Sequence, residues 1–206
     1  MKWGIISKNM NGTIILTSIG TSTEFCRNKI SELLPSLKNK NLVLITTAAR
    51  DKENNKWNIL TKEQLLAMGY EKVDFLDLEA TPNVNFDNYD TIYVCGGNTF
   101  KLMKAVNESN FKIDVLKVLN RGGVYIGASA GALILSPTIA MAGEVEPDEN
   151  EVGLLDMTGM NIINFEILPH YSPEQDSQIN AYKLKTTNEI KLITNDEIIV
   201  LEYKQG

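Results

Sequence analysis

One segment of the chain, Gly122–Leu135, combines residue types and a spacing that could do chemistry. It contains the pattern Gly-x-Ser-x-Gly at Gly127, Ser129 and Gly131, preceded by an apolar run that predicts a strand and followed by one that predicts a helix. Between a strand and a helix, such a serine sits on a sharp turn with its hydroxyl exposed, as a nucleophile requires. Ser129 is therefore the candidate nucleophile, and an ordinary glycine-rich connection is the competing interpretation.

A serine hydroxyl needs a base to take its proton, and histidine is the usual one. The chain has one histidine, His170. We expect a strand over 162–168 that ends at Pro169, because proline cannot donate a hydrogen bond to a sheet. His170 would then follow a strand, at the edge where functional groups of open α/β sheets gather. The sequence therefore predicts that Ser129 and His170 form a pair.

A second glycine-rich turn follows another apolar run. The segment Asp90–Phe100 predicts a strand that leads into Gly96, Gly97 and Asn98, with a helix beginning at about Thr99. Adjacent glycines allow backbone N–H groups to face an anionic ligand. The structural alternative is a tight turn in which Asn98 caps the helix, and both interpretations can hold together.

Around these segments, short apolar stretches alternate with longer amphipathic ones, which is typical of a parallel sheet covered by helices. We expect strands at 13–18, 42–46, 73–76, 92–95, 192–195 and 198–203, and helices at 24–37, 62–68, 99–106, 113–120 and 175–187. The acidic stretch 144–153 should be an exposed loop. The sequence thus predicts a single α/β domain over residues 1–206. Residues 1–12 would be an N-terminal extension or an added edge strand, because Asn11-Gly12 is a hairpin signal.

Composition narrows the choice of partners. The net charge of −6 argues against a nucleic acid or an anionic membrane as partner. No apolar run approaches the roughly 18 residues of a membrane span, and we see no secretory signal. The two cysteines, Cys26 and Cys95, are too few and too scattered for a disulfide scaffold or a metal site, so we expect a cytoplasmic protein without a metal. Whether the chain forms a homodimer is left open.

Three segments together resemble the peptidase E family of serine peptidases, which includes alpha-aspartyl dipeptidase and has cyanophycinase as a relative. They are Cys95-Gly-Gly-Asn-Thr-Phe-Lys-Leu, Gly122-Gly-Val-Tyr-Ile-Gly-Ala-Ser-Ala-Gly-Ala and Leu168-Pro-His-Tyr, in the family's order. The resemblance extends over about 13–203. It implies a flavodoxin-like three-layer α/β sandwich with a mostly parallel sheet, similar to class I glutamine amidotransferases. It also implies that no cofactor is needed.

The resemblance implies a role for several residues. Ser129 would be the nucleophile, His170 the general base, and the amides of Gly97 and Ala130 the oxyanion donors. In the family, an acidic residue shortly before the last strands orients the histidine, and Glu197 is its counterpart here. Glu144 matches a second acidic position proposed for that role and is the alternative. We favour Glu197, because the chain there should return to the sheet edge beside the histidine.

The sequence departs from the family at the expected substrate site. Aspartyl dipeptidases carry an arginine on the helix after the histidine, which suits a substrate carboxylate. The matching stretch here, 173–185, has no arginine, and Lys183 and Lys185 are its only cations. A strict preference for an N-terminal aspartate is therefore not expected.

The leading hypothesis is a dipeptidase-like serine peptidase that hydrolyses short peptides through a Ser-His-acid triad and an acyl-enzyme. Two alternatives stay open on the same fold. One is an amidotransferase-like amide hydrolase, whose relatives use a cysteine at the turn. The other is a non-catalytic protein that binds a small molecule.

Overall fold

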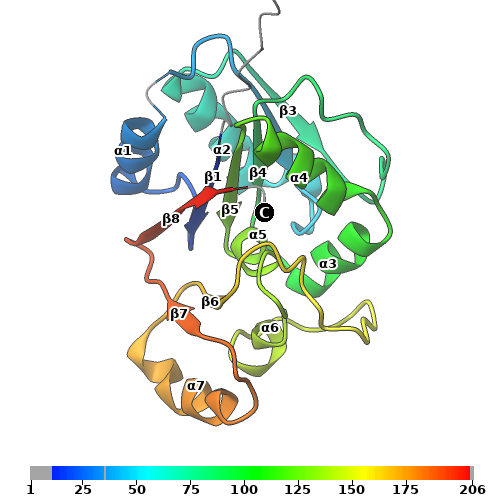
Figure 1. Ribbon diagram of the computed structural model, residues 1–206, viewed down its shortest axis with the longest axis vertical. Helices are drawn as coiled ribbons and strands as arrows, with labels where there is room; N and C mark the ends of the chain where they lie inside the picture. The colour runs from blue at the N-terminus through cyan, green and yellow to red at the C-terminus, as the bar shows by residue number, and fades with distance from the viewer. Residues whose placement is uncertain (1–10, 35, 205–206) are drawn as a thin grey trace, which may run out of the picture.

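The computed structural model describes residues 11–34 and 36–204, and the prediction for residues 1–10 lies outside this range. A six-stranded sheet with the order β3-β2-β4-β5-β1-β8 forms the centre of the molecule (Figure 1). Its strands are β1 (Gly12–Thr17), β2 (Asn41–Ile45), β3 (Lys72–Leu76), β4 (Thr91–Val94), β5 (Val124–Ala128) and β8 (Ile198–Tyr203). Only β8 is antiparallel to its neighbour, β1. The predicted mostly parallel sheet is therefore confirmed.

Helices connect the strands and cover the sheet. They are α1 (Glu24–Leu33), α2 (Lys56–Met68), α3 (Thr99–Asn107), α4 (Phe111–Asn120), α5 (Ala130–Leu133), α6 (Met141–Glu144) and α7 (Asp176–Lys183), with 3₁₀ turns at Lys52–Asn54 and Pro173–Gln175. Helix α2 begins six residues before the predicted position, because the side chain of Asn55 accepts a hydrogen bond from the N–H of Trp57 and caps it there. Helix α1 ends before Pro35 rather than continuing to residue 37.

Neighbouring side chains of each strand enter different cores, because side chains alternate between the faces of a sheet. Ile14 packs in the cluster formed with α3, α4 and α5. Ile15 packs in the other cluster, with Ile30 of α1 and Leu65 of α2. The molecule is thus a three-layer α/β/α sandwich, with α1 and α2 on one side of the sheet and α3 and α4 on the other (Figure 1).

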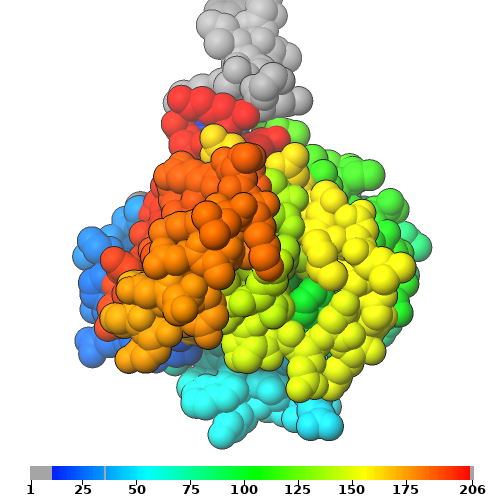
Figure 2. Space-filling view, turned by 90° about the horizontal axis from the view of Figure 1, so that it is seen from below, coloured from blue at the N-terminus to red at the C-terminus, as the bar shows by residue number. Residues whose placement is uncertain are grey.

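A smaller unit lies below the carboxyl ends of the parallel strands. It contains the parallel pair β6 (Glu166–Leu168) and β7 (Ile190–Leu192), which packs with α6 and α7 around Ile179 and Tyr182. The carboxylate of Glu166, 1% exposed, accepts hydrogen bonds from the side chains of Tyr182, Thr186 and Asn188. Seen from below, α7 and the segment around residues 145–165 cover this end of the molecule (Figure 2).

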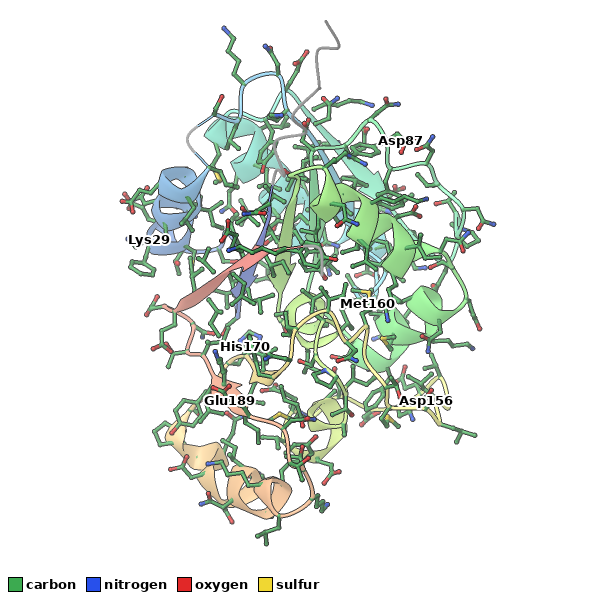
Figure 3. All side chains as sticks on the ribbon, in the orientation of Figure 1. Lys29, Asp87, Asp156, Met160, His170 and Glu189 are labelled. Carbon is green, nitrogen blue, oxygen red and sulfur yellow. The ribbon has the colours of Figure 1, made fainter. Side chains whose placement is uncertain are left out.

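Both strands of this unit differ from their predicted ranges. Residues 160–163 do not pair as a strand, because their N–H groups bond to the backbone of residues 134–136 after α5. Residues 193–195 leave β7 to run beside the end of β1, where the hydroxyl of Ser18 donates to the carbonyl of Thr194 (2.9 Å). These tertiary contacts position the segment that carries His170 (Figure 3). Within the described residues, no helix is long and apolar enough to cross a membrane.

Candidate active site

Ser129 lies on a turn that joins β5 directly to α5. Its φ of 51° and ψ of −115° are outside the regions that ordinary residues favour. Such a backbone costs about 1–3 kcal/mol and persists only where the surroundings enforce it. Here the N–H of Ser129 donates to the carbonyl of Thr17 at the end of β1 (3.0 Å), which fixes the turn to the neighbouring strand. The predicted strand, turn and helix are therefore observed, although α5 is only four residues long.

Gly127, two residues before the serine, is required by the close packing of α5 against β5. A Cβ placed on Gly127 would lie 2.5 Å from the carbonyl oxygen of Gly131 in α5. No side chain fits at that distance, so α5 can fold back against β5 only because residue 127 is glycine.

The turn after β4 passes beside the serine. A Cβ on Gly96 would lie 3.5 Å from Oγ of Ser129, so this backbone borders the hydroxyl. Gly97 has a φ of 138°, and a Cβ there would lie 2.2 Å from the carbonyl oxygen of Ala48. Asn98 caps α3 by accepting from the N–H of Lys101 (2.9 Å). The helix-capping interpretation of this turn is therefore confirmed, and the binding of an anion by its N–H groups stays a prediction.

The amides of Gly97 and Ala130 have no acceptor within the described protein. Neither N–H donates to a backbone or side-chain group of residues 11–34 and 36–204. Ala130 is the first residue of α5, and N–H groups in the first turn of a helix have no partner within the helix. Their role as oxyanion donors therefore stays a prediction.

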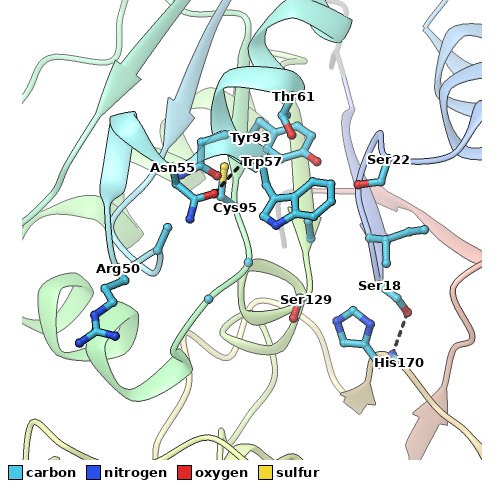
Figure 4. A pocket seen from close by; sticks show the side chains of 16 residues that line it. Ser18, Ser22, Arg50, Asn55, Trp57, Thr61, Tyr93, Cys95, Ser129 and His170 are labelled. Atoms are coloured by element: carbon cyan, nitrogen blue, oxygen red, sulfur yellow. Dashed lines mark hydrogen bonds between the residues drawn. The ribbon is translucent and has the colours of Figure 1, made fainter.

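His170 follows β6 and Pro169, as the sequence predicts, and has an unusual backbone with a φ of 56°. Its N–H donates to Oγ of Ser18 (2.9 Å), a buried side chain at the end of β1 (Figure 4). The register of the sheet pairs Thr17 with Ala128, so β1 and β5 end at the same level. Ser18 therefore anchors the histidine beside the strand end that carries Ser129.

The ring of His170 is held by Asn195. Its Nδ1 lies 3.0 Å from Oδ1 of Asn195. An amide oxygen can only accept, so this bond places the ring proton on Nδ1 and leaves the Nε2 lone pair available. Asn195 was not among the predicted site residues, although its place in the turn before β8 was a signal that the residues of this turn reach the ring.

Neither predicted acid makes this contact. The carboxylate of Glu197 accepts from the N–H of Thr194 (2.8 Å) and so closes its own turn. Glu144 pairs with Lys185 at the other end of the lower unit. The expectation that the chain returns beside His170 is met, but the side chain that reaches the ring is Asn195, because the local turn bond turns Glu197 away.

Ser129 and His170 line one cavity of about 530 Å³ at the carboxyl ends of β1, β2, β4 and β5. Its wall also includes Arg50, Trp57 and Cys95 (Figure 4). Cys95 is buried, and burial raises the pKa of its thiol well above the usual value. The thiol is therefore protonated at neutral pH and a poor nucleophile, which leaves Ser129 as the candidate.

The three arginines have different surroundings. Arg27 and Arg121 donate to backbone carbonyl oxygens and have structural roles. Arg50 is exposed and lines the cavity, and its guanidinium has no hydrogen-bond or ion-pair partner among the described residues. The single arginine at the site thus comes from the loop after β2, and the described helix α7 contributes none.

A carboxylate on the acidic loop also lies near the histidine. Burial raises the pKa of Glu146 above its ordinary value of 4.5, while a hydrogen bond from Gln175 and the charge of His170 act in the opposite direction. Gln175 in turn accepts from the N–H of Ser172 (3.0 Å). The loop after α6 is thereby tied to the segment that follows His170.

Replacing Glu146 by glutamine is expected to change how stability depends on pH. A raised pKa in the native state means that burial disfavours the charged form, so this group costs stability as pH rises above about 4.5. The Glu146→Gln variant lacks that cost, and should gain stability relative to the wild type between pH 4 and pH 7. Urea unfolding at both pH values measures it. The control is Glu149→Gln on the same loop, and an equal gain in both variants would contradict the assignment.

Fold and site together define a serine-type peptidase, a hydrolase that acts on peptide bonds, built on an α/β sandwich. Comparison with known proteins agrees: the sequence profile of peptidase family S51 matches residues 14–205. The chain belongs to this family.

Individual relatives support the same grouping. An uncharacterized peptidase of Listeria monocytogenes, Lmo0363, is 30% identical over 184 residues, which are 85% of this chain and 88% of the relative. Peptidase E of a Nostoc species is 27% identical, over 92% of this chain and 76% of the relative. A crystal structure of a Listeria monocytogenes protein assigned to peptidase E superposes with a TM-score of 0.77 at 29% identity, and covers 95% of this chain and 96% of that one.

Proposed function

We propose that this peptidase hydrolyses short peptides, in the manner of a dipeptidase, through an acyl-enzyme on Ser129. The observation that carries the proposal is the shared cavity of Ser129 and His170, with Asn195 behind the imidazole ring. The cavity is small enough to favour a short substrate over a folded protein. The turn at Ser129 would act as a nucleophile elbow, and we propose that the chain forms one catalytic domain related to class I glutamine amidotransferases.

The proposed reaction begins at the free lone pair of His170. Its Nε2 takes the proton of Ser129 as Oγ attacks the scissile carbonyl carbon, and the carbonyl oxygen becomes an oxyanion. The same nitrogen then gives the proton to the leaving amine, and the C–N bond breaks. In the second half of the reaction His170 takes a proton from a water molecule, whose oxygen bonds to the acyl carbon. The bond from that carbon to Oγ of Ser129 then breaks, and His170 returns the proton to Oγ.

The amides of Gly97 and Ala130 would stabilise the oxyanion. Ala130 directly follows the serine, Gly97 lines the same cavity, and neither N–H has a partner among the described residues. Because they are backbone groups held by a glycine turn and a helix start, they need no reorganisation when charge develops. One such donor is typically worth about 3 kcal/mol of barrier.

Asn195 would take the place that an acid has in the more common triad. A neutral amide can hold the tautomer and orientation of the ring, as in the Cys-His-Asn arrangement of papain-like proteases. It adds no negative charge beside the imidazolium that forms during the reaction. We therefore propose Ser129, His170 and Asn195 as the catalytic group, in place of the triad with Glu197 or Glu144.

Labelling with a fluorophosphonate tests the nucleophile directly. We expect one covalent adduct per chain, on Ser129, because the proposal activates this hydroxyl through His170, which lines the same cavity. Tandem mass spectrometry locates the adduct, and residual peptidase activity should fall in proportion to labelling. His170→Ala serves as the control, since it should label far more slowly. An adduct elsewhere, or full labelling without loss of activity, would reject the proposal.

A further inference from the structure

Trp57 is an exposed aromatic side chain at the catalytic cavity. Its side chain is 58% exposed, although indole is among the largest apolar groups in proteins. It lines the same cavity as Ser129 and His170. The exposed surface of Trp57 is therefore available to a molecule bound at the serine.

The backbone of Trp57 is held firmly. It is the second residue of α2, and its N–H donates to the cap Asn55 (2.9 Å). The neighbouring Asn58 is buried and donates to the carbonyl of Lys52 (2.8 Å). Further along α2, Leu65 is fully buried in the core between helix and sheet. The indole thus projects from a fixed helix end, and can act as a preformed platform.

The position of the indole places it on the side of the cavity where the leaving group of the substrate would be. In Figure 4 it lies above the gap between Ser129 and His170, whereas Arg50 lies on the far side of Ser129. In the proposed reaction the leaving nitrogen must be in that gap, because His170 gives it a proton. Trp57, which lines the cavity above this gap, is therefore the aromatic side chain open to the residue attached to that nitrogen.

A second apolar side chain adjoins the same region. Ile19 lines the cavity and follows Ser18, whose hydroxyl accepts from the N–H of His170. The ammonium of Lys56 lies 4.9 Å from the centre of the indole of Trp57. Ile19 and the indole, which both line the cavity, are the apolar side chains on the proposed leaving-group side.

We infer that Trp57 and Ile19 form a subsite for an apolar side chain on the residue that follows the scissile bond. This inference rests on the proposed peptidase function. It adds a preference for an apolar side chain after the scissile bond, which a charged group at the site would not explain. A leucine or phenylalanine side chain bound there loses contact with water, as does the exposed indole. Burying a side chain as large as leucine or phenylalanine changes kcat/KM by about tenfold or more.

Steady-state kinetics with two matched peptide series tests the subsite. In the first series the leaving residue varies, with Ala-Phe compared to Ala-Gly. In the second the other residue varies, with Phe-Gly compared to Ala-Gly. We expect the wild type to favour Ala-Phe over Ala-Gly by about tenfold or more in kcat/KM, and to show a clearly smaller ratio in the second series.

Variants of α2 assign the preference to the indole. Trp57→Ala should reduce the Ala-Phe to Ala-Gly ratio to about 2 or less, because the platform is gone, while Trp57→Phe should keep most of it. Leu66→Ala is the matched control, since Leu66 is an apolar residue, 41% exposed, in the last turn of the same helix. A ratio that is unchanged in Trp57→Ala, or a change confined to the Phe-Gly series, would overturn the inference.

A binding measurement separates this inference from the proposed function. The chain has two tryptophans, Trp3 and Trp57. In a Trp3→Phe, Ser129→Ala protein the emission therefore reports on Trp57 alone. We expect Ala-Phe to shift this emission and to bind about tenfold more tightly than Ala-Gly. Tight binding without turnover by the Ser129-containing protein would reject the peptidase mechanism but keep the subsite. Turnover of both peptides with no change in emission would reject the subsite alone.

Discussion

Ser129→Ala is expected to lower kcat/KM for dipeptide hydrolysis by about 10⁴-fold or more, because the hydroxyl that forms the acyl-enzyme is removed. His170→Ala should be about equally damaging, since an unactivated hydroxyl is a poor nucleophile. The double variant should lose little more than either single one, because nucleophile and base act as a unit. Steady-state assays with Ala-Leu at high enzyme concentration measure all three.

The structure supplies the controls for this experiment. Ser31→Ala changes a half-buried serine of α1 that does not line the cavity, and should keep wild-type activity. Thermal unfolding should show that the Ser129→Ala protein is folded. If Ser129→Ala retained more than about a hundredth of the activity, or if the losses from the two single variants multiplied in the double variant, the serine and the histidine would not form a catalytic pair.

Asn195→Ala is expected to lower kcat about 10²-fold with little change in KM, because the imidazole loses the partner that fixes its orientation. Asn195→Asp should retain much of the activity, since a carboxylate oxygen can accept from Nδ1 in the same way. Glu197→Gln should stay within about twofold of the wild type. Its amide oxygen can still accept from the N–H of Thr194 and preserve the turn.

These three variants decide which residue orients the histidine. Activity and the pH profile of kcat should be measured for each, because a purely structural defect would not respond to the exchange of alanine for aspartate at residue 195. A loss in Glu197→Gln as large as that in Asn195→Ala would show that Glu197 reaches the ring during catalysis. Glu197 would then orient His170 during catalysis, as the resemblance to peptidase E implies, instead of Asn195.

Much of the fold follows from local sequence. Alternating strand and helix signals predicted the mostly parallel sheet, and β8 occupies the range that was expected. The strands of the main sheet are apolar and bounded by polar or glycine residues, so their periodicity is a strong signal. The weaker elements were misplaced: β7 is three residues long and ends at Leu192, and the carbonyls of Ile193 and Thr194 beyond it accept from the hydroxyl of Ser18. Contacts between residues far apart in the chain determine where such short segments begin and end, and these contacts leave no periodic pattern in the sequence.

The sequence by itself predicted Ser129 and His170 as the reacting pair, because a glycine-flanked turn is a local pattern and a single histidine leaves no other choice of histidine as base. The tertiary structure decided which side chain orients the ring. Asn195 and Glu197 lie two residues apart in one turn, and a hydrogen bond inside that turn turns the carboxylate away from His170. It also decided that Trp57 lines the same cavity as the serine, since α2 and β5 are far apart in the chain and come together only where parallel strands end at a common edge.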